Sequence, residues 1–181
     1  MAQQPLNSTH HGNVQRRLGK GMIYVGWLLA LGLLTWAFGS WLDTQRNPNR
    51  HVKSMIEAGT QVVVLERNRY GHYHATGKIN DREVEFMLDT GATTVSIPAA
   101  VAKRLGLKRG PAVPVSTANG TVMTYLTRLH SVRLGDIELN NVTANINPHT
   151  KSNEVLLGMS FLKYLEFTQR GDILILKQLS H

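Results

Sequence analysis

The pattern of apolar and polar positions divides the chain into two parts. Residues 21–42 carry no charged side chain and are almost continuously apolar. A helix over this range would be about 33 Å long, which matches a bilayer hydrocarbon core of about 30 Å. Tyr24 and Trp27 near one end, and Trp36 and Trp41 near the other, follow the preference of amphipathic rings for the membrane interface. The pattern therefore predicts a single transmembrane helix.

Two other interpretations of this segment remain open. A buried helix of a soluble domain normally shows polar residues every few positions, whereas only Thr35 and Ser40 interrupt this one. A cleaved signal peptide is the second alternative, because Ala37-Phe38-Gly39 offers small residues at the two cleavage positions. The apolar stretch is longer than a usual signal core, so we favour an uncleaved anchor.

Residues 1–20 form a polar tail that we expect in the cytoplasm. Arg16, Arg17 and Lys20 crowd the near edge of the predicted span, and residues 1–20 contain no acidic side chain. Positive residues favour the cytoplasmic side of a membrane. The expected location is therefore a bacterial inner membrane, crossed once, with the C-terminal domain in the periplasm.

In the remainder of the chain, apolar and polar residues alternate over short segments, as they do in β-strands. Residues 43–60 are polar and predict a linker with little to bury, and a domain follows over residues 61–181. Pro98 and Gly106 bound one short predicted helix over residues 99–105. The expected strands are joined by turn signals and predict a small all-β barrel or sandwich; they cover residues 62–65, 72–79, 83–88, 113–117, 121–126, 131–134, 137–139, 142–146 and 173–176.

Composition excludes several classes of function. The chain has no cysteine, which excludes disulfides, thiolate metal sites and cysteine nucleophiles. Its formal net charge of +8 is spread along the chain, and aromatic residues make up only 7%. A nucleic-acid-binding protein more often shows a basic stripe with interleaved aromatics, so we expect no nucleic-acid partner.

One segment carries candidate chemistry. An apolar strand ends at Asp89, and Thr90, Gly91 and Ala92 follow it. A carboxylate at this place would be fixed by its strand, while the glycine lets backbone N–H groups approach it closely. The tripeptide is also compatible with an ordinary turn, since all three residue types are common in turns.

The flanks of this segment resemble those of retropepsin-like (clan AA) aspartic proteases, and in particular their membrane-anchored bacterial branch. The resemblance rests on Phe86–Ala92, on Val95–Pro98 and on Val155–Met159. It implies the acid protease fold, a closed barrel with one lobe per chain, here preceded by a transmembrane helix.

The resemblance also implies roles for individual residues. Asp89 matches the catalytic aspartate, Thr90 the residue that locks two active-site loops together, and Gly91 a backbone contact to substrate. Thr93 departs from the Ser or Asp of many relatives, which leaves the role of that position open. The other matched positions are Ala92 in the active-site loop, Ala118, Asn119 and Gly120 at the tip of a substrate-covering flap, and Leu157 and Gly158 beneath the loop.

The number of Asp-Thr-Gly motifs in the chain predicts its oligomeric state. Activation of water by this mechanism requires two carboxylates, and only one Asp-Thr-Gly is present. The second Asp89 must therefore come from a second chain on a two-fold axis. We expect a homodimeric, membrane-anchored aspartic endopeptidase acting on protein or peptide substrates, most active at mildly acidic pH. The alternative is a non-catalytic dimeric peptide-binding module with the same barrel.

No cofactor or metal is expected for this chemistry. His72 and His74 fall on one face of a predicted strand, but the sequence places no further ligand near them. A Ser-His-Asp hydrolase is disfavoured, because no serine lies in a nucleophile-elbow context.

Overall fold

The computed structural model describes residues 12–117 and 120–179. The chain divides into two compact units, Met1–Asp43 and Thr44–His181. Each unit has its own internal packing, so the two are described separately below.

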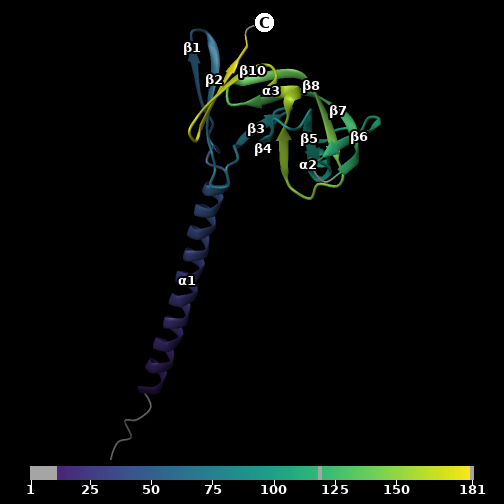
Figure 1. The fold of residues 1–181 in the computed structure, drawn as a ribbon. Coiled ribbons are helices and arrows are strands. Elements are labelled where there is room, and N and C mark those ends of the chain that lie inside the picture. The colour runs from purple at the N-terminus through teal and green to yellow at the C-terminus, as the bar shows by residue number, and fades with distance from the viewer. Residues whose placement is uncertain (1–11, 118–119, 180–181) are drawn as a thin grey trace, which may run out of the picture. The chain divides into compact units, whose positions relative to one another are not determined.

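The first unit is built on helix α1 (Gly12–Arg46, Figure 1), and the last residues of this helix, Thr44–Arg46, are counted in the second unit. Its segment Tyr24–Arg46 is long and apolar enough to cross a membrane, and none of its most apolar window is buried within the protein. Leu28 is 68% exposed and Trp27 is 73% exposed. The helix is longer than the predicted span of 21–42 at both ends, because polar residues continue its hydrogen-bonded turns beyond the apolar stretch.

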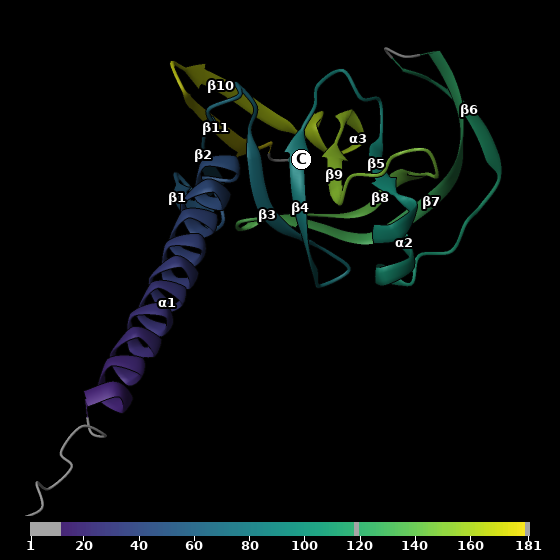
Figure 2. The ribbon, with the colours of Figure 1, turned by 90° about the horizontal axis from the view of Figure 1, so that it is seen from below.

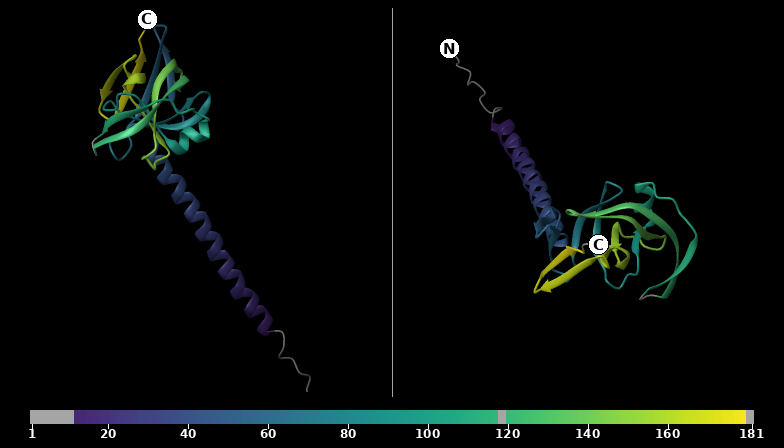
Figure 3. Two further views of the ribbon diagram at one scale, coloured as in Figure 1. Left: turned by 90° about the vertical axis from the view of Figure 1, so that its right-hand side faces the viewer. Right: turned by 90° about the horizontal axis from the view of Figure 1, so that it is seen from above.

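The second unit contains two sheets, seen from different sides in Figures 1 and 3. A four-stranded antiparallel sheet has the order β1 (Lys53–Glu57), β2 (Thr60–Glu66), β11 (Ile173–Gln178), β10 (Leu165–Arg170). A seven-stranded sheet has the order β3 (His74–Ile79), β4 (Arg82–Leu88), β9 (Glu154–Leu157), β5 (Val95–Pro98), β8 (Ile137–Asn147), β7 (Gly120–Leu134), β6 (Ala112–Thr117). Strand β3 also pairs with β7 and closes this sheet into a barrel. The expected all-β closed barrel is confirmed.

The core of the second unit fills the barrel. Phe86, Ile97, Leu129 and Phe161 are fully buried. Along β4, buried Val84 and Phe86 alternate with less buried neighbours, which is the period-2 pattern of a strand with one face on the core. The apolar face of β4 thus fixes the direction in which the chain leaves the strand at Asp89.

The short predicted helix is confirmed as α2 (Ala99–Leu105), which ends at Gly106 in the left-handed conformation with φ +71°. The structure adds a one-turn helix, α3 (Met159–Leu162), and the strands β1, β9 and β10, which the sequence pattern did not predict. The two strands expected at 137–139 and 142–146 are one continuous strand, β8, in which Asn141 takes a positive φ of 56°.

Residues 43–60, which we expected to be a linker with little to bury, contain regular structure and buried side chains. Residues 53–57 form β1, and Asn47 and Asn49 are 5% and 4% exposed. The Asn49 side-chain amide donates to the carbonyls of Glu66 and His74, at 2.9 and 2.6 Å, and its Oδ1 accepts from the Glu66 N–H at 2.7 Å. These polar side chains are buried because the strand backbones satisfy them, which an apolar pattern cannot reveal.

Candidate active site

Asp89 lies directly after β4, where that strand runs parallel to β9. The last pair of the ladder joins Leu88 to Leu157, and the Asp89 N–H donates to the Leu157 carbonyl at 3.2 Å. The Gly91 N–H donates to Asp89 Oδ1 at 2.9 Å, and the Ala92 N–H to the Asp89 carbonyl at 3.2 Å. The backbone of Asp89 is therefore held on both sides, one oxygen of its carboxylate accepts from the Gly91 N–H, and the residue is half-buried.

Gly158 and α3 support this loop from below. A Cβ at Gly158 would lie 2.6 Å from the carbonyl oxygen of Ala92 and closer still to that of Thr94. The Met159 N–H donates to the Ala92 carbonyl at 2.8 Å, and the Ser160 N–H to the Thr93 carbonyl at 3.0 Å. Only a glycine permits this close approach, so the predicted supporting positions Leu157 and Gly158 do contact the loop.

A polar network that the sequence did not reveal holds the far end of the loop. Asn145 on β8 is 4% exposed; its amide donates to Thr94 Oγ1 at 2.8 Å, and its Oδ1 accepts from Ser96 Oγ at 3.0 Å. Ser160 Oγ accepts from the Val95 N–H at 3.0 Å and donates to the Thr143 carbonyl at 2.7 Å. The one available signal was a set of polar residues inside otherwise apolar strands.

The loop opens into a cleft of about 660 Å³. Residues of β6, from Val113 to Thr117, face Asp89 across it, and Leu156 of β9 contributes an apolar wall. Asp89 is the one acidic side chain among the described residues that line the cleft. The cleft therefore has a single carboxylate in its lining, held in place by the Gly91 N–H.

Comparison with known proteins agrees with this geometry. Residues 75–164 match the family model described as gag-polyprotein putative aspartyl protease. An uncharacterised Sinorhizobium protein is 30% identical over 179 residues, covering 90% of this chain and 76% of the relative. The crystal structure of a retropepsin-like aspartic protease from Rickettsia conorii superimposes with a TM-score of 0.56 and 28% identity, covering 70% of this chain and 95% of that one. The chain belongs to the retropepsin-like aspartic protease family.

In this retropepsin-like chain the predicted flap is a hairpin of β6 and β7. Its register pairs Thr117 with Gly120, and Thr117 Oγ1 donates to the Gly120 carbonyl at 2.7 Å. Gly120 takes a φ of +107° and begins β7. Ala118 and Asn119, the other two predicted flap residues, lie outside the described residues.

Thr90 and Thr93 lie on the exposed side of the active-site loop. Within residues 12–117 and 120–179, the Thr90 hydroxyl makes no hydrogen bond, and Thr93 lines the cleft beside Asp89.

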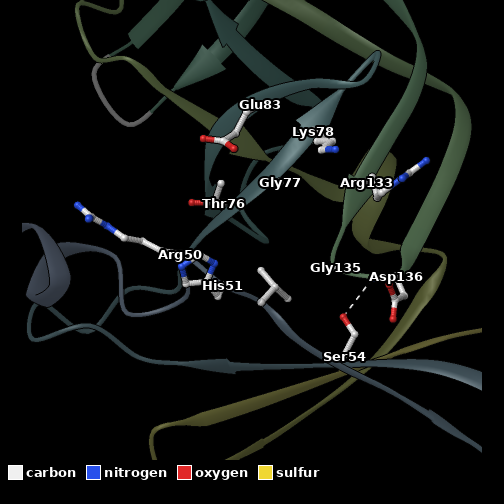
Figure 4. A pocket seen from close by; sticks show the side chains of 11 residues that line it. Arg50, His51, Ser54, Thr76, Gly77, Lys78, Glu83, Arg133, Gly135 and Asp136 are labelled. Carbon is white, nitrogen blue, oxygen red and sulfur yellow. Dashed lines mark hydrogen bonds between the residues drawn. The ribbon is translucent and has the colours of Figure 1, made fainter.

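A second hollow, of about 520 Å³, lies between residues 50–54 and strands β3 and β4 (Figure 4). Its lining mixes basic Lys78 and Arg133 with acidic Glu83 and Asp136, and Ser54 Oγ accepts a 3.1 Å hydrogen bond from the Asp136 N–H. It shares no lining residue with the Asp89 cleft. Charges of both signs at its wall give it no preference for one class of ligand.

Proposed function

We propose that this protein is a membrane-anchored aspartic endopeptidase whose active site forms between two copies of the chain. The observation that carries the proposal is the single carboxylate of Asp89, fixed by the Gly91 N–H at 2.9 Å on the floor of a peptide-sized cleft. Peptide hydrolysis by carboxylates needs two of them, one acting as base and one as acid. The family assignment and the exposed Thr90 edge of the loop support pairing with a second chain.

In the proposed mechanism, an extended peptide lies between β6 of the flap and the Asp89 loop. One Asp89 takes a proton from a water molecule placed between the two carboxylates, and that water attacks the scissile carbonyl carbon. The other Asp89, which carries the shared proton, donates it to the carbonyl oxygen, which gives a tetrahedral diol. The first Asp89 then gives the proton that it took from the water to the amide nitrogen, and one hydroxyl of the diol returns its proton to the second Asp89. The C–N bond breaks, and the amine and the new carboxylic acid leave. The Gly91 N–H keeps the carboxylate in position throughout, so little reorganisation is needed when charge develops.

Anchoring through α1 is part of the proposal. The segment Tyr24–Arg46 has the length and composition of a membrane span, and basic Arg16, Arg17 and Lys20 precede it. The Sinorhizobium relative matches 90% of the chain, which is more than Thr44–His181 contains, so the likeness extends into α1. We place the catalytic unit on the periplasmic side of a bacterial inner membrane, where anchoring raises the local concentration of chains and favours dimers.

Peptide-library cleavage tests the proposed activity. The full chain in detergent is assayed between about pH 4 and 8 beside Asp89→Asn, with Asp136→Asn as the matched control because Asp136 lies outside the cleft. We expect cleavage by the wild type and Asp136→Asn, strongest on the acidic side, and none by Asp89→Asn. Cleavage by Asp89→Asn at the wild-type rate would refute the mechanism, and silence from a demonstrated dimer would favour a peptide-binding module.

Mixed dimers test whether the two carboxylates come from two chains. When wild type is exchanged with an equal amount of Asp89→Asn chain, random pairing leaves about a quarter of the dimers with two aspartates. Activity per wild-type chain should therefore fall to about half. Activity that stays proportional to the amount of wild-type chain would show that one chain suffices.

The anchor is tested by topology and by N-terminal sequencing. A C-terminal alkaline phosphatase fusion should be active, and a C-terminal green fluorescent protein fusion dark, if the domain is exported unfolded to the periplasm. The mature protein should retain residues 1–20 and resist extraction from membranes at alkaline pH. A mature N-terminus just after Gly39 would instead identify a cleaved signal peptide.

A further inference from the structure

Three side chains with metal-ligating atoms meet where β3, β4 and β9 run side by side (Figure 2). Glu85 of β4 pairs directly with Glu154 of β9, and His74 of β3 lies opposite Met87, the next residue on the same face of β4. One ligand atom from each of the three residues lies within 4.8 Å of the other two. These neighbours of His74 could not be predicted from the sequence, because the β4–β9 pairing joins residues far apart in the chain.

The imidazole of His74 is buried and has no hydrogen-bond partner at Nδ1. The residue is 5% exposed, and Nδ1 lies 3.8 Å from Oε1 of Glu85 and 3.8 Å from Oε1 of Glu154. These separations are too long for hydrogen bonds. A buried nitrogen aimed at two carboxylates without bonding to either is a costly arrangement for the apoprotein.

The charges around His74 favour a cation in this place. The carboxylates of Glu85 and Glu154 have side-chain exposures of 33% and 15%. Arg46 forms an ion pair with Glu154, whereas Glu85 makes no ion pair within the described ranges other than the long contact to His74. Nδ1 of a neutral imidazole can donate its lone pair to a metal ion.

We propose that His74, Glu85 and Glu154 bind a divalent transition-metal ion of the zinc type. Imidazole nitrogen and carboxylate oxygen are ligands of Zn²⁺, whereas Ca²⁺ and Mg²⁺ prefer sites made of oxygen alone. Ligand atoms around tetrahedral zinc are about 3.4 Å apart. The two carboxylates lie 3.8 Å from His74 Nδ1, and the three ligand atoms lie within 4.8 Å of one another, so the side chains must draw together around the ion. Three protein ligands leave a fourth position for water. Arg46 competes with the ion for Glu154.

The site would tie together the strands that hold the Asp89 loop. Glu85 lies in β4 shortly before Asp89, and Glu154 begins the strand that ends at Leu157 beneath the loop. An ion bound to the folded barrel and not to the unfolded chain stabilises the folded state by mass action. Metal binding does not depend on peptide cleavage. The chain could therefore fail to bind Zn²⁺ and still cleave peptides, or bind Zn²⁺ and cleave none, so the two proposals are tested separately.

The experiment is a calorimetric titration of Zn²⁺ into the full chain in detergent at about pH 7.5, in an Asp89→Asn background that removes the cleft carboxylate as a ligand. We expect one tight Zn²⁺ per chain, and Co²⁺ in its place should give the visible absorption bands of a tetrahedral site. Glu85→Gln and Glu154→Gln should each weaken Zn²⁺ binding by at least about tenfold. Arg46→Gln should strengthen it, because it removes the competing cation.

Matched controls separate this site from adventitious binding to surface histidines. Glu83→Gln changes an exposed carboxylate on the same strand, and His130→Asn an exposed histidine elsewhere. Neither should alter Zn²⁺ affinity. Failure of the Asp89→Asn chain to bind Zn²⁺, or binding that both Glu85→Gln and Glu154→Gln leave unchanged, would overturn the proposal. Both variants replace partly exposed side chains, so the conclusion does not require a His74 variant to fold.

Discussion

Replacing Gly158 by alanine should damage the active site more than any other single methyl group added to the barrel. The backbone at Gly158 has φ −91° and ψ −173°, which an alanine adopts without strain. The added Cβ would instead meet backbone on two sides, at 2.6 Å from the Ala92 carbonyl oxygen and closer to that of Thr94. Neither carbonyl can turn away like a flexible side chain, so the Asp89 loop itself must move.

The magnitude follows from the contacts that would be disturbed. Overpacking of a tight site costs about 1–3 kcal/mol. The hydrogen bonds from the Met159 and Ser160 N–H groups to the loop, at 2.8 and 3.0 Å, would both lengthen. Each contributes about 0.5–1.5 kcal/mol, so the free energy of unfolding should fall by about 3 kcal/mol. A displacement of Asp89 by about 1 Å should lower kcat by about a hundredfold.

The assay must report on the barrel alone. The chain has three tryptophans, Trp27, Trp36 and Trp41, and all lie in α1, so tryptophan fluorescence does not follow unfolding of the second unit. Hydrogen exchange measured by mass spectrometry gives the unfolding free energy of the barrel strands from their slowest amides. Gly171→Ala is the control: its φ is +60° and nothing lies within 4 Å of an added Cβ, so only about 1–2 kcal/mol and no activity should be lost. Wild-type stability and activity in Gly158→Ala would refute the steric argument.

Three further outcomes are expected. Asn145→Ala removes the support of Thr94 and should destabilise the barrel by about 2 kcal/mol, with kcat/KM falling more than stability alone explains, measured by exchange and peptide cleavage. Ser160→Ala removes two hydrogen bonds to backbone and should cost about 1–2 kcal/mol in the same exchange assay. The ion pair with Lys177 lowers the pKa of Glu57 below its ordinary 4.5, so its stabilising effect is present above that pH and is lost as the pH falls. Lys177→Gln should therefore flatten the decline in stability toward about pH 3, as seen in acid-unfolding curves.

Alternating strands with one face on the core could be predicted from the sequence, and edge strands could not. The strand expected at 83–88 is found as β4, because Val84 and Phe86 recur at period 2. Strand β10 has one buried residue at its start and is exposed along the rest. Its sequence therefore lacks the alternation of apolar and polar residues that marks a strand with one buried face. Strand β1 likewise exposes Met55 and Ile56 and exists through its antiparallel pairing with β2. Pairing over a distance, rather than local pattern, decides such segments.

In the candidate site too, some residues could be predicted from the sequence and others could not. The loop from Asp89 to Ala92 could be predicted from the apolar strand that precedes it and from its glycine, whereas its support at Gly158 followed from the resemblance to retropepsin-like proteases. Asn145 could not, since a lone asparagine in a strand is indistinguishable from a surface residue until its partners are known. Its burial is tolerated only because Thr94 and Ser96 satisfy its amide.

A single parallel ladder accounts for both sites. The β4–β9 register places Leu88 beside Leu157, which brings the Asp89 N–H to the Leu157 carbonyl, and the same register places Glu85 beside Glu154. A slip of one residue would turn every side chain of one strand to the opposite face. Such a slip of β9 would both bury Glu154 in the core and move Gly158 away from the Asp89 loop. The close contacts of Gly158 therefore fix the position of the carboxylates around His74, and an ion bound there would in turn hold the register on which the Asp89 loop depends.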